Sequence, residues 1–317
     1  MDKKLLIISH VADNDGITPI ILAKLAFPKF DKLLLEISEV NQNVRDNLDK
    51  YDEIHVVDLN ISEELAEEIN KNENYKNKIK IFDHHISGIN LNKYPFITVI
   101  DEKNGRKESG TSIYYNYLKQ ISDNKILHSK ATESLTEYVR LIDTFDFKNE
   151  EEKENANNIG YLFDILGKDN YIDYFYNYLQ THETFEYQDQ EKLLIKLQKD
   201  KVDNYIKRKE AEMFKAKLDN YNVGVIYAES NRSLLGNYLI NKHEDLDFII
   251  LINVSRSISY RGKDKADLSI ISQKYGGGGH KNAAGSPLPK DLLNNITKLI
   301  YNNIEIKEEE KWNQNFI

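Results

Sequence analysis

The chain has 317 residues, enough for two domains of ordinary size, and its 40% hydrophobic and 30% charged residues are typical of a globular protein. It contains no cysteine, which excludes disulfides and thiolate metal sites, so any metal must be held by oxygen and imidazole. The net charge of −9 argues against strong non-specific binding to duplex nucleic acid. Because the sequence shows neither a signal peptide nor an apolar stretch of roughly 18–20 residues, we expect a cytoplasmic protein.

The first candidate site follows a predicted strand near the amino terminus. Residues 5–9 form an apolar run, and the loop after it carries three potential metal ligands, His10, Asp13 and Asp15. Side chains just past a strand of a parallel sheet lie at the edge where open α/β proteins bind their ligands. An ordinary polar turn, in which Asp and Asn bond to the backbone, is the alternative interpretation.

The next elements indicate repeated strand–helix units. After the first loop we predict a helix over residues 20–27, with Thr18 as its cap and Pro19 in its first position. Further strands are expected over residues 32–37, 54–57, 79–82 and 96–100. This alternation predicts an α/β domain with a mainly parallel sheet and flanking helices.

Two of these strands also end in potential ligands. Asp58 follows the third strand, and Asp83, His84 and His85 follow the fourth. A turn role for Asp58 and a surface loop for the two histidines are the alternatives. Repetition of the pattern at one sheet edge favours a shared site.

The middle of the chain is predicted to be helical. A helix over residues 130–142 ends at Asp143, a further candidate acid, and residues 149–158 are predicted to form a charged loop. Residues 188–218 contain no proline or glycine and are predicted to form one long connector helix. We therefore expect a first domain over residues 1–187, the connector over 188–218 and a smaller α/β domain over 219–317.

The C-terminal domain contains a glycine-rich motif. Predicted strands over residues 223–227, 248–254 and 257–261 precede a run of four glycines over residues 276–279, followed by His280. Consecutive glycines let the backbone approach a ligand and expose successive N–H groups. A flexible hinge is the alternative.

The candidate ligands are four aspartates and two histidines, a set that suits two hard divalent ions such as Mn²⁺ or Mg²⁺. They are His10, Asp13, Asp15, Asp58, His84 and Asp143. A single ion would leave several of these acids repelling one another. Two ions about 3.5–4 Å apart can activate water and stabilise an in-line attack on phosphorus.

The order of these residues resembles the DHH phosphoesterase superfamily. The matching motifs are His10-x-x-Asp13-x-Asp15-Gly16, then Asp58, Asp83-His84-His85 and Asp143-Thr144. The four glycines with His280, followed by Asn-Ala-Ala-Gly over residues 282–285, are similar to the DHH-associated substrate domain. The resemblance covers nearly the whole chain and departs from the usual pattern only in the neighbours of the first motif, at residues 11, 12 and 14.

The resemblance implies a role for each residue. One ion would be bound by His10 and Asp13, the other by Asp15, His84 and Asp143, and Asp58 would bridge both. Asp83 would orient a ligand histidine, and His85 would face the substrate in the catalytic step. Substrate phosphates, in a cleft between the domains, would be held by Arg261, Gly277, Gly278, Gly279 and His280.

The length and layout resemble the small oligoribonuclease type, which removes mononucleotides from very short RNA and often also acts on 3′-phosphoadenosine 5′-phosphate. The resemblance implies two divalent ions, with Mn²⁺ ahead of Mg²⁺ or Co²⁺, and short RNA or nucleotide phosphates as partners, without membrane or long duplex. The alternatives are a cyclic- or linear-dinucleotide phosphodiesterase, a RecJ-like single-strand exonuclease and a non-catalytic nucleotide-binding regulator. The sequence leaves open the cleavage polarity and whether the chain forms a homodimer.

Overall fold

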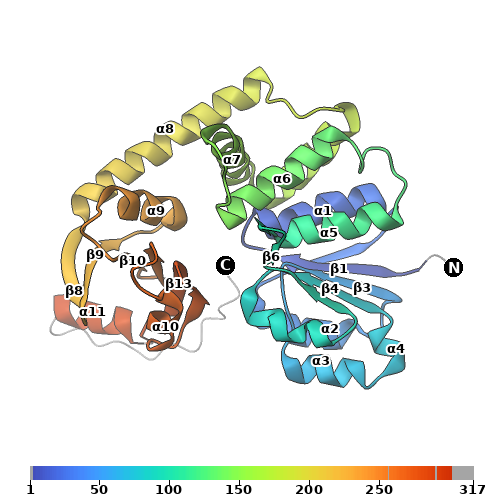
Figure 1. Ribbon diagram of the computed structural model, residues 1–317, viewed down its shortest axis with the longest axis horizontal. Helices are drawn as coiled ribbons and strands as arrows, with labels where there is room; N and C mark the ends of the chain where they lie inside the picture. Colours follow the sequence, from blue (N-terminus) through green and yellow to red (C-terminus); the bar gives the residue numbers. More distant parts are fainter. Residues whose placement is uncertain (1–2, 256, 290, 302–317) are drawn as a thin grey trace. The chain divides into compact units, whose positions relative to one another are not determined.

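The computed structural model describes residues 3–255, 257–289 and 291–301. The chain divides at residue 200 into an N-terminal and a C-terminal unit (Figure 1). Among the described residues, none of the helices has an apolar stretch that could cross a membrane.

The N-terminal unit is built on a parallel sheet with the strand order β2-β1-β3-β4-β5. The strands are β1 (Leu5–His10), β2 (Asp31–Leu35), β3 (Glu53–Val57), β4 (Ile79–Asp83) and β5 (Ile97–Val99). The central strands are rich in Ile, Leu and Val because both of their faces are covered. The strand order reverses between β1 and β3, and in such sheets ligands bind outside the carboxyl ends at this point.

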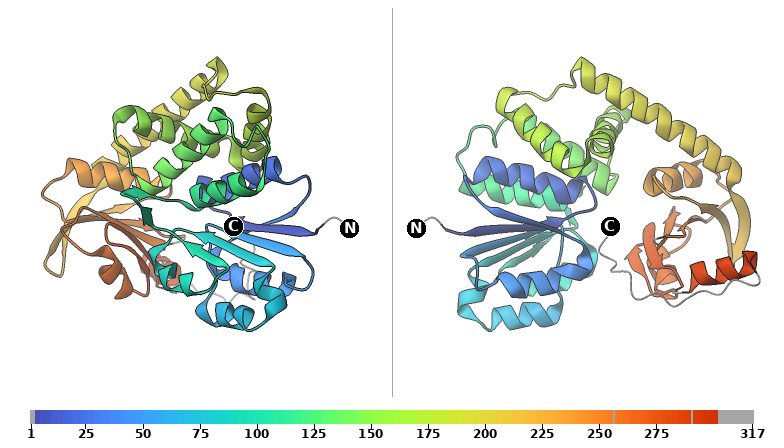
Figure 2. Two further views of the ribbon diagram at one scale, coloured as in Figure 1. Left: turned by 45° about the vertical axis from the view of Figure 1, so that its right-hand side comes forward. Right: turned by 180° about the vertical axis from the view of Figure 1, so that it is seen from behind.

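Helices cover both faces of this sheet (Figures 1 and 2). On one side, α1 (Asn14–Ala26) and α5 (Gly110–Ile121) lie next to the sheet, and α6 (Lys130–Thr144) and α7 (Glu150–Thr181) pack against α1 as a further layer. On the other lie α2 (Val40–Asn47), α3 (Glu63–Asn70) and α4 (Glu73–Lys76). Short elements complete the unit: η1 (Ile37–Glu39), η2 (Ile86–Lys93), β6 (Glu102–Lys103) and β7 (Arg106–Lys107). The predicted α/β class with a parallel sheet is confirmed.

The first helix begins at Asn14, earlier than predicted. Its cap is Asp13, whose Oδ1 accepts a hydrogen bond from the Gly16 N–H at 3.0 Å. The prediction of Thr18 as the cap is therefore wrong, because an acid upstream satisfies a free N–H of the first turn.

Pro19 lies inside helix α1 instead of at its start. A proline provides no N–H for the carbonyl four residues earlier, which here belongs to Asp15. The Thr111 hydroxyl donates to that carbonyl at 2.7 Å. A bond from another helix thus offsets the missing helical bond.

The predicted loop over residues 149–158 is also wrong, because helix α7 begins at Glu150. The cap is Asn149, whose Oδ1 accepts from the Glu152 N–H at 2.9 Å. Three glutamates occupy the first turn, where negative charge interacts favourably with the helix dipole. The charge that suggested a loop stabilises a helix start instead.

The connector helix α8 (Asp189–Glu212) is shorter than predicted. The chain then forms strand β8 (Phe214–Leu218), which pairs antiparallel with β9 (Tyr221–Tyr227). Residues 215–218 alternate exposed and partly buried positions, which is a strand pattern. The connector prediction missed it because no glycine or proline marks the change.

The C-terminal unit contains a six-stranded mixed sheet with the order β12-β13-β11-β10-β9-β8. Its remaining strands are β10 (Phe248–Asn253), β11 (Ser257–Gly262), β12 (Gly278–His280) and β13 (Ala283–Pro287). Helix α9 (Arg232–Lys242) lies on one face, with α10 (Leu268–Gln273) and α11 (Leu292–Ile300) on the other. The core on the α10 side includes Val223, Phe248, Tyr260 and Leu268.

The glycine run forms a hairpin, which excludes the flexible hinge. Strand β12 pairs with β13 through residues 278–280. A Cβ on Gly277 would lie 2.0 Å from the Gly285 carbonyl oxygen, and Gly279 has a φ of 137°. Close backbone approach and an unusual dihedral therefore both require glycine here.

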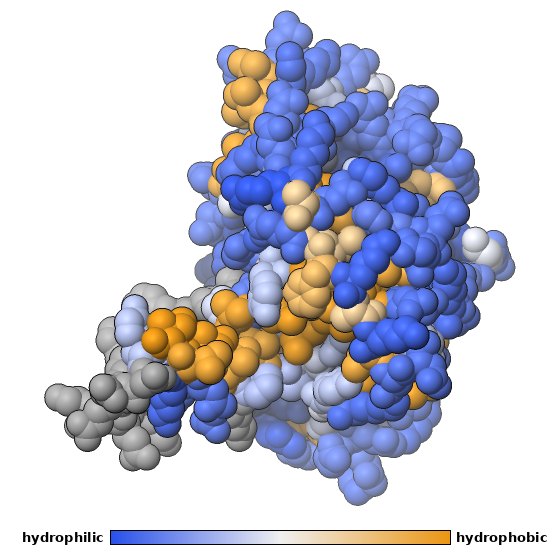
Figure 3. Space-filling view, turned by 90° about the vertical axis from the view of Figure 1, so that its left-hand side faces the viewer, coloured by the Kyte–Doolittle hydropathy of each residue, from blue (hydrophilic) through white to orange (hydrophobic). Residues whose placement is uncertain are grey.

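The surface is largely hydrophilic, with apolar side chains gathered in parts of the face drawn in Figure 3. Large apolar side chains that are exposed among the described residues include Leu193, Leu197, Leu299 and Ile300. Exposed apolar residues are common in globular proteins, so they do not by themselves indicate a site.

Candidate metal centre

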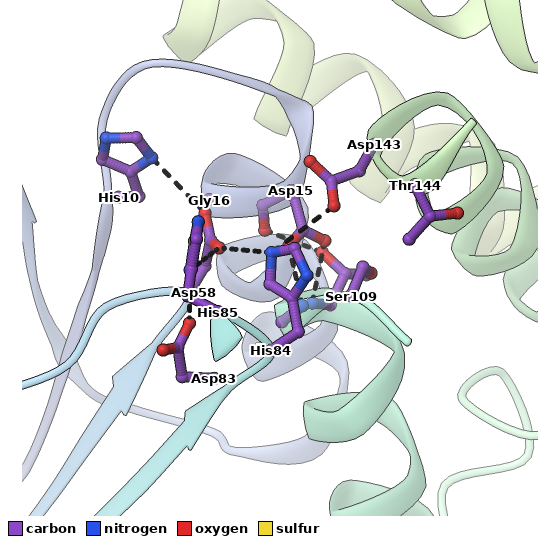
Figure 4. Close-up of polar contacts among 12 residues, drawn as sticks. His10, Asp15, Gly16, Asp58, Asp83, His84, His85, Ser109, Asp143 and Thr144 are labelled. Carbon is purple, nitrogen blue, oxygen red and sulfur yellow. Dashed lines mark hydrogen bonds and ion pairs between the residues drawn. The ribbon is translucent and has the colours of Figure 1, made fainter. Parts of the chain in front are cut away.

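The predicted ligands of the N-terminal unit meet at the carboxyl edge of its sheet (Figure 4). They come from the ends of β1, β3 and β4, the first turn of α1 and the last turn of α6. The structure groups them into two sets of three, each with ligand atoms within 4.8 Å of one another. The sets are His10, Asp13 and Asp58, and Asp15, His84 and Asp143.

The first set surrounds the Nδ1 atom of His10. This atom lies 3.5 Å from Asp13 Oδ2 and 3.4 Å from Asp58 Oδ2. The imidazole is largely buried, whereas Asp13 is half exposed. Two carboxylates and one imidazole nitrogen facing a common point are a donor set that suits a hard divalent ion.

The second set surrounds the Nε2 atom of His84. This atom lies 3.4 Å from Asp143 Oδ2 and 3.8 Å from Asp15 Oδ2. Among the described residues, Asp143 Oδ2 is buried without a hydrogen-bond partner. A buried acceptor that lacks a hydrogen bond calls for an explanation, and a bound cation would supply one.

Asp58, a member of the first set, also faces the second set. Its Oδ2 faces His10, and its Oδ1 lies 3.4 Å from His84 Nε2. The residue is 3% exposed and has a φ of 57°, which Asp tolerates better than most side chains. A Cβ on Gly110 would lie 2.6 Å from the Asp58 Cβ, so glycine there leaves room for this conformation.

The start of helix α5 holds Asp15 in place. The Gly110 N–H donates to Asp15 Oδ2 at 2.7 Å and the Thr111 N–H to Asp15 Oδ1 at 2.9 Å. Free N–H groups at a helix start bind anions, and here the anion is a side chain of the same chain.

Asp83 and His85 belong to a third group, with Asp58 and His84, whose possible ligand atoms also lie within 4.8 Å of one another. Asp83 Oδ1 lies 2.7 Å from His85 Nδ1, and the Asn60 amide donates to Asp83 Oδ2 at 2.5 Å. Asp83 therefore orients His85, whereas the resemblance implied that it orients a ligand histidine. A Cβ on Gly88 would lie 2.1 Å from Asn60 Nδ2, so Gly88 makes room for this pair.

A buried arginine stabilises the end of helix α6, where Asp143 lies. Arg140, which is 1% exposed, lies one turn earlier on α6 and donates to both Glu137 oxygens and to Asp146 Oδ2 at 2.9 Å. It also donates to the Lys107 carbonyl at 2.8 Å. These bonds fix the end of α6. Asp146, two residues past the end of α6, thus pairs with arginine.

The side-chain pKa values reflect this crowding of charge. Burial lowers the pKa of His84, but the neighbouring Asp58 and Asp143 carboxylates raise it overall to about 11. Burial likewise opposes the charged form of His10, and Asp13 and Asp58 raise its pKa to about 10. Burial raises the pKa of Asp143 to about 7. In the protein alone, protonated imidazoles therefore balance the acids, and a cation would replace those protons.

Glu36 belongs to this neighbourhood but was not predicted. Its Oε2 lies 3.8 Å from His10 Nε2, while the Nδ1 of the same ring faces the first set. Ligand histidines commonly direct their second ring nitrogen at a carboxylate. The signal was present, because Glu36 directly follows β2 as Asp58 follows β3.

The predicted substrate residues all lie in the C-terminal unit. Arg261 is on β11, and Gly277, Gly278, Gly279 and His280 lie in or beside β12. Arg261 donates to the Ser233 hydroxyl of α9, whereas His280 is exposed at the hairpin. Their substrate role stays a prediction.

Known proteins resemble this chain in both sequence and fold. Residues 4–142 match the family model described as DHH family, N-terminal domain. Oligoribonuclease NrnB of Bacillus subtilis (strain 168) is 32% identical over 290 residues, which cover 88% of this chain and 72% of that protein. A 3′,5′-cyclic-nucleotide phosphodiesterase of Helicobacter pylori (strain ATCC 700392 / 26695) is 25% identical, over 84% of this chain and 80% of that protein.

A solved structure, the pGpG-specific phosphodiesterase PggH from Vibrio cholerae, has a TM-score of 0.51 with 15% identity. The match covers 94% of this chain and 97% of that one and indicates a shared fold. The family model and the relative at 32% identity support assignment of the chain to a family. The Asp83-His84-His85 motif lies at the site described above. The chain belongs to the DHH family of phosphoesterases.

Proposed function

We propose that this chain is a Mn²⁺-dependent phosphodiesterase that hydrolyses short oligoribonucleotides to mononucleotides in the cytoplasm. The observation that carries the proposal is the position of Asp58, which belongs to the first ligand set and whose second carboxylate oxygen faces His84 of the other set. Binding of a nucleotide alone does not require such a paired arrangement. The 32% identity to Oligoribonuclease NrnB supports short RNA as the substrate.

The two ligand sets fit a pair of divalent ions. His10 and Asp13 would hold one, Asp15, His84 and Asp143 the other, and Asp58 both. Oxygen and imidazole ligands without sulfur are compatible with Mn²⁺, and Mg²⁺ or Co²⁺ are the alternatives. When bound, such ions supply the charge that holds the scissile phosphate and activates the attacking water.

His85 is placed to move a proton. Its Nδ1 lies 2.7 Å from Asp83 Oδ1, so Asp83 orients the ring. Burial lowers the His85 pKa, but Asp83 raises it overall, so the protonated form is favoured. We assign His85 Nε2 as the donor that protonates the leaving oxygen, with Asp83 holding the ring.

Substrate selection is assigned to the C-terminal unit. Arg261 would bind a phosphate, Gly277, Gly278 and Gly279 would let it approach the backbone closely, and His280 would add a hydrogen bond. The net charge of −9 argues against a long basic track along which a strand could bind. The affinity should therefore saturate after a few nucleotides.

The test is a hydrolysis assay with Mn²⁺ on a substrate panel. The panel contains RNA of two to five nucleotides, short DNA, 3′-phosphoadenosine 5′-phosphate, cyclic di-AMP, 3′,5′-cyclic AMP and pyrophosphate. Short RNA should be the fastest substrate. Faster turnover of a cyclic nucleotide would replace the proposal with a cyclic-nucleotide phosphodiesterase, the activity that names the Helicobacter relative.

Two further assays test the metal pair and the substrate length. Asp58→Ala should abolish turnover at saturating Mn²⁺, because the residue would serve both ions, and activity near wild type would refute the paired-ion model. In a length series at two salt concentrations, RNA of two to four nucleotides should be cleaved faster than a strand several times longer. Equal cleavage of the long strand with a steep salt dependence would indicate a RecJ-like exonuclease.

A further inference from the structure

Helix α6 ends with an aromatic residue in the left-handed conformation. Phe145 has a φ of 53° and a ψ of 29°, and its N–H donates to the Leu141 carbonyl at 2.9 Å. Glycine or asparagine usually occupies this position after a helix, because a bulky side chain crowds the backbone there. In the described part of the chain, six non-glycine residues have a positive φ, and five of them are Asp or Asn. Phe145 is the exception.

The packing of Phe145 does not account for this choice of residue. Phe145 is 43% exposed, and its ring makes an edge contact with Phe147, with the centroids 6.0 Å apart. A phenylalanine that served the core would have most of its apolar surface removed from water. An unfavourable backbone conformation that packing does not offset is typical of a functional site.

Phe145 lies directly beside the metal centre. It follows the candidate ligand Asp143 by two residues, so the two Cα atoms are at most about 7.6 Å apart. The residues on either side of it are held in place. The Thr144 hydroxyl donates to the Arg140 carbonyl at 2.8 Å, and Arg140 donates to Asp146 Oδ2 at 2.9 Å. The backbone that carries the ring is therefore fixed next to Asp143.

We propose that Phe145 stacks on a nucleobase of the oligonucleotide whose phosphate is bound at the metal centre. The inference rests on the proposed function, because it names a residue that recognises the same substrate. Every base has a flat π face, so stacking on an aromatic ring accepts any sequence. The contact also distinguishes a nucleotide from pyrophosphate, which has no base.

The experiment compares three substrates with the full-length protein and Mn²⁺. They are pApA and two analogues in which 1-deoxyribose replaces the first or the second nucleoside, so that the phosphates and the 2′-hydroxyl stay and one base is lost. The wild-type kcat/KM should be about tenfold higher for pApA than for one of the analogues, as expected for one stacked base. Phe145→Asn should erase this preference, mainly through KM.

The stability of the same variant separates binding from structure. Asparagine adopts the left-handed conformation more readily than phenylalanine, so the urea midpoint of Phe145→Asn in EDTA should be higher than that of the wild type. A residue with a purely structural role would not combine higher stability with weaker substrate binding. A lower midpoint would show that packing holds the ring in place, which would overturn the proposal.

Two further variants serve as controls. Phe145→Tyr keeps an aromatic ring and should keep most of the preference for pApA. Phe214→Ala removes a ring of similar exposure, 49%, from the edge strand β8 of the C-terminal unit and should leave the preference unchanged. A wild-type enzyme that does not discriminate between the three substrates, or a preference that Phe145→Asn retains, would overturn the proposal and leave the proposed function standing.

A binding assay separates this outcome from failure of the proposed function. If no dinucleotide is hydrolysed, the proposed function fails. The ring is then tested by titrating AMP and ribose 5-phosphate into the full-length protein with Mn²⁺. AMP should bind more tightly than ribose 5-phosphate, and Phe145→Asn should remove the difference. Equal binding of the two probes to the wild type would refute the stacking contact.

Discussion

Thr111 holds Asp15 at two points, because its backbone N–H donates to Asp15 Oδ1 and its hydroxyl donates to the Asp15 carbonyl. The first bond positions a candidate metal ligand. The second satisfies the carbonyl that Pro19 leaves without a helical partner. One residue at the start of α5 therefore fixes both the side chain and the backbone of a residue on α1.

The Thr111→Val variant tests how much the Thr111 hydroxyl contributes to the stability of the protein. Valine keeps the shape and the backbone N–H but leaves the buried Asp15 carbonyl unpaired, which costs about 1–3 kcal/mol. The unfolding free energy, measured by urea denaturation, should fall by that amount, and Mn²⁺ affinity should fall with it. Thr111→Ser retains the hydroxyl and should stay near wild type. A Val variant as stable as wild type would show that the hydroxyl bond is dispensable.

Glu36→Gln tests the carboxylate behind His10. The change keeps the size but removes the charge that faces His10 Nε2, so the ring should bind a metal less well at Nδ1. Removing a carboxylate that bonds to a ligand histidine typically lowers the metal affinity 10–100-fold. Since Glu36 is half exposed and 3.8 Å away, we expect the lower end of this range in Mn²⁺ affinity by calorimetry.

A matched control for this variant is Glu64→Gln, which removes one negative charge from an exposed position at the start of α3. It should bind Mn²⁺ like the wild type. If both variants lose affinity equally, net charge would explain the effect, and the interaction of Glu36 with His10 would not.

The Arg140→Met variant tests whether Arg140 holds Asp143 in position at the end of α6. The change leaves Glu137 and Asp146 without this buried cation. Removing one partner of a buried ion pair typically costs about 3–5 kcal/mol. Because these acids are about a third exposed, solvent should reduce the loss in unfolding free energy to about 2–3 kcal/mol. Mn²⁺ titration of the folded variant should show weakened binding at the Asp143 set. Arg106→Met, which leaves the Asp146 pair intact, should weaken binding less.

His55 provides a pH-dependent contribution to stability away from the metal centre. It is buried, with Nε2 2.9 Å from Glu53 Oε1 and Nδ1 2.8 Å from the Tyr114 hydroxyl. Burial lowers its pKa below 6.5, and the opposing effect of Glu53 is smaller. The unfolded chain therefore binds more protons than the folded one below pH 6.5, and stability falls as the pH falls through this value.

The measurement compares urea denaturation of wild type and His55→Gln from pH 7.5 to 5.5 in EDTA. Glutamine can donate to Glu53 and accept from Tyr114 without titrating. The wild type should lose more unfolding free energy than the variant as the pH drops. Identical pH profiles would mean that His55 is not buried in its neutral form.

The strands and the ligand pattern were predictable because they depend on local signals. Runs of Ile, Leu and Val mark strands buried on both faces, and acids or histidines directly after them mark the ligand-binding edge. This reasoning located Asp58 and His84 at the edge where the structure groups them, whereas Asp143 was found at the end of a predicted helix. Applied to β2, it would also have identified Glu36.

The features that were predicted wrongly from the sequence depend on contacts with residues far along the chain. Pro19 suggested a helix start, but Thr111 stabilises it inside α1. The glutamates after Asn149 suggested a loop, but they suit the dipole of a capped helix. The surroundings of Arg140 were not predicted, because only the fold brings Glu137, Asp146 and the Lys107 carbonyl around it.

The glycines beside the metal centre restrict how this site can be engineered. A single methyl group on Gly16 would lie 2.2 Å from the His10 carbonyl oxygen, and methyl groups on Gly88 and Gly110 would collide with Asn60 and Asp58. Combinatorial libraries that seek new substrates should keep these three positions fixed. Variation is better placed at exposed His280, in the C-terminal unit, where side chains can change without moving a ligand of either ion.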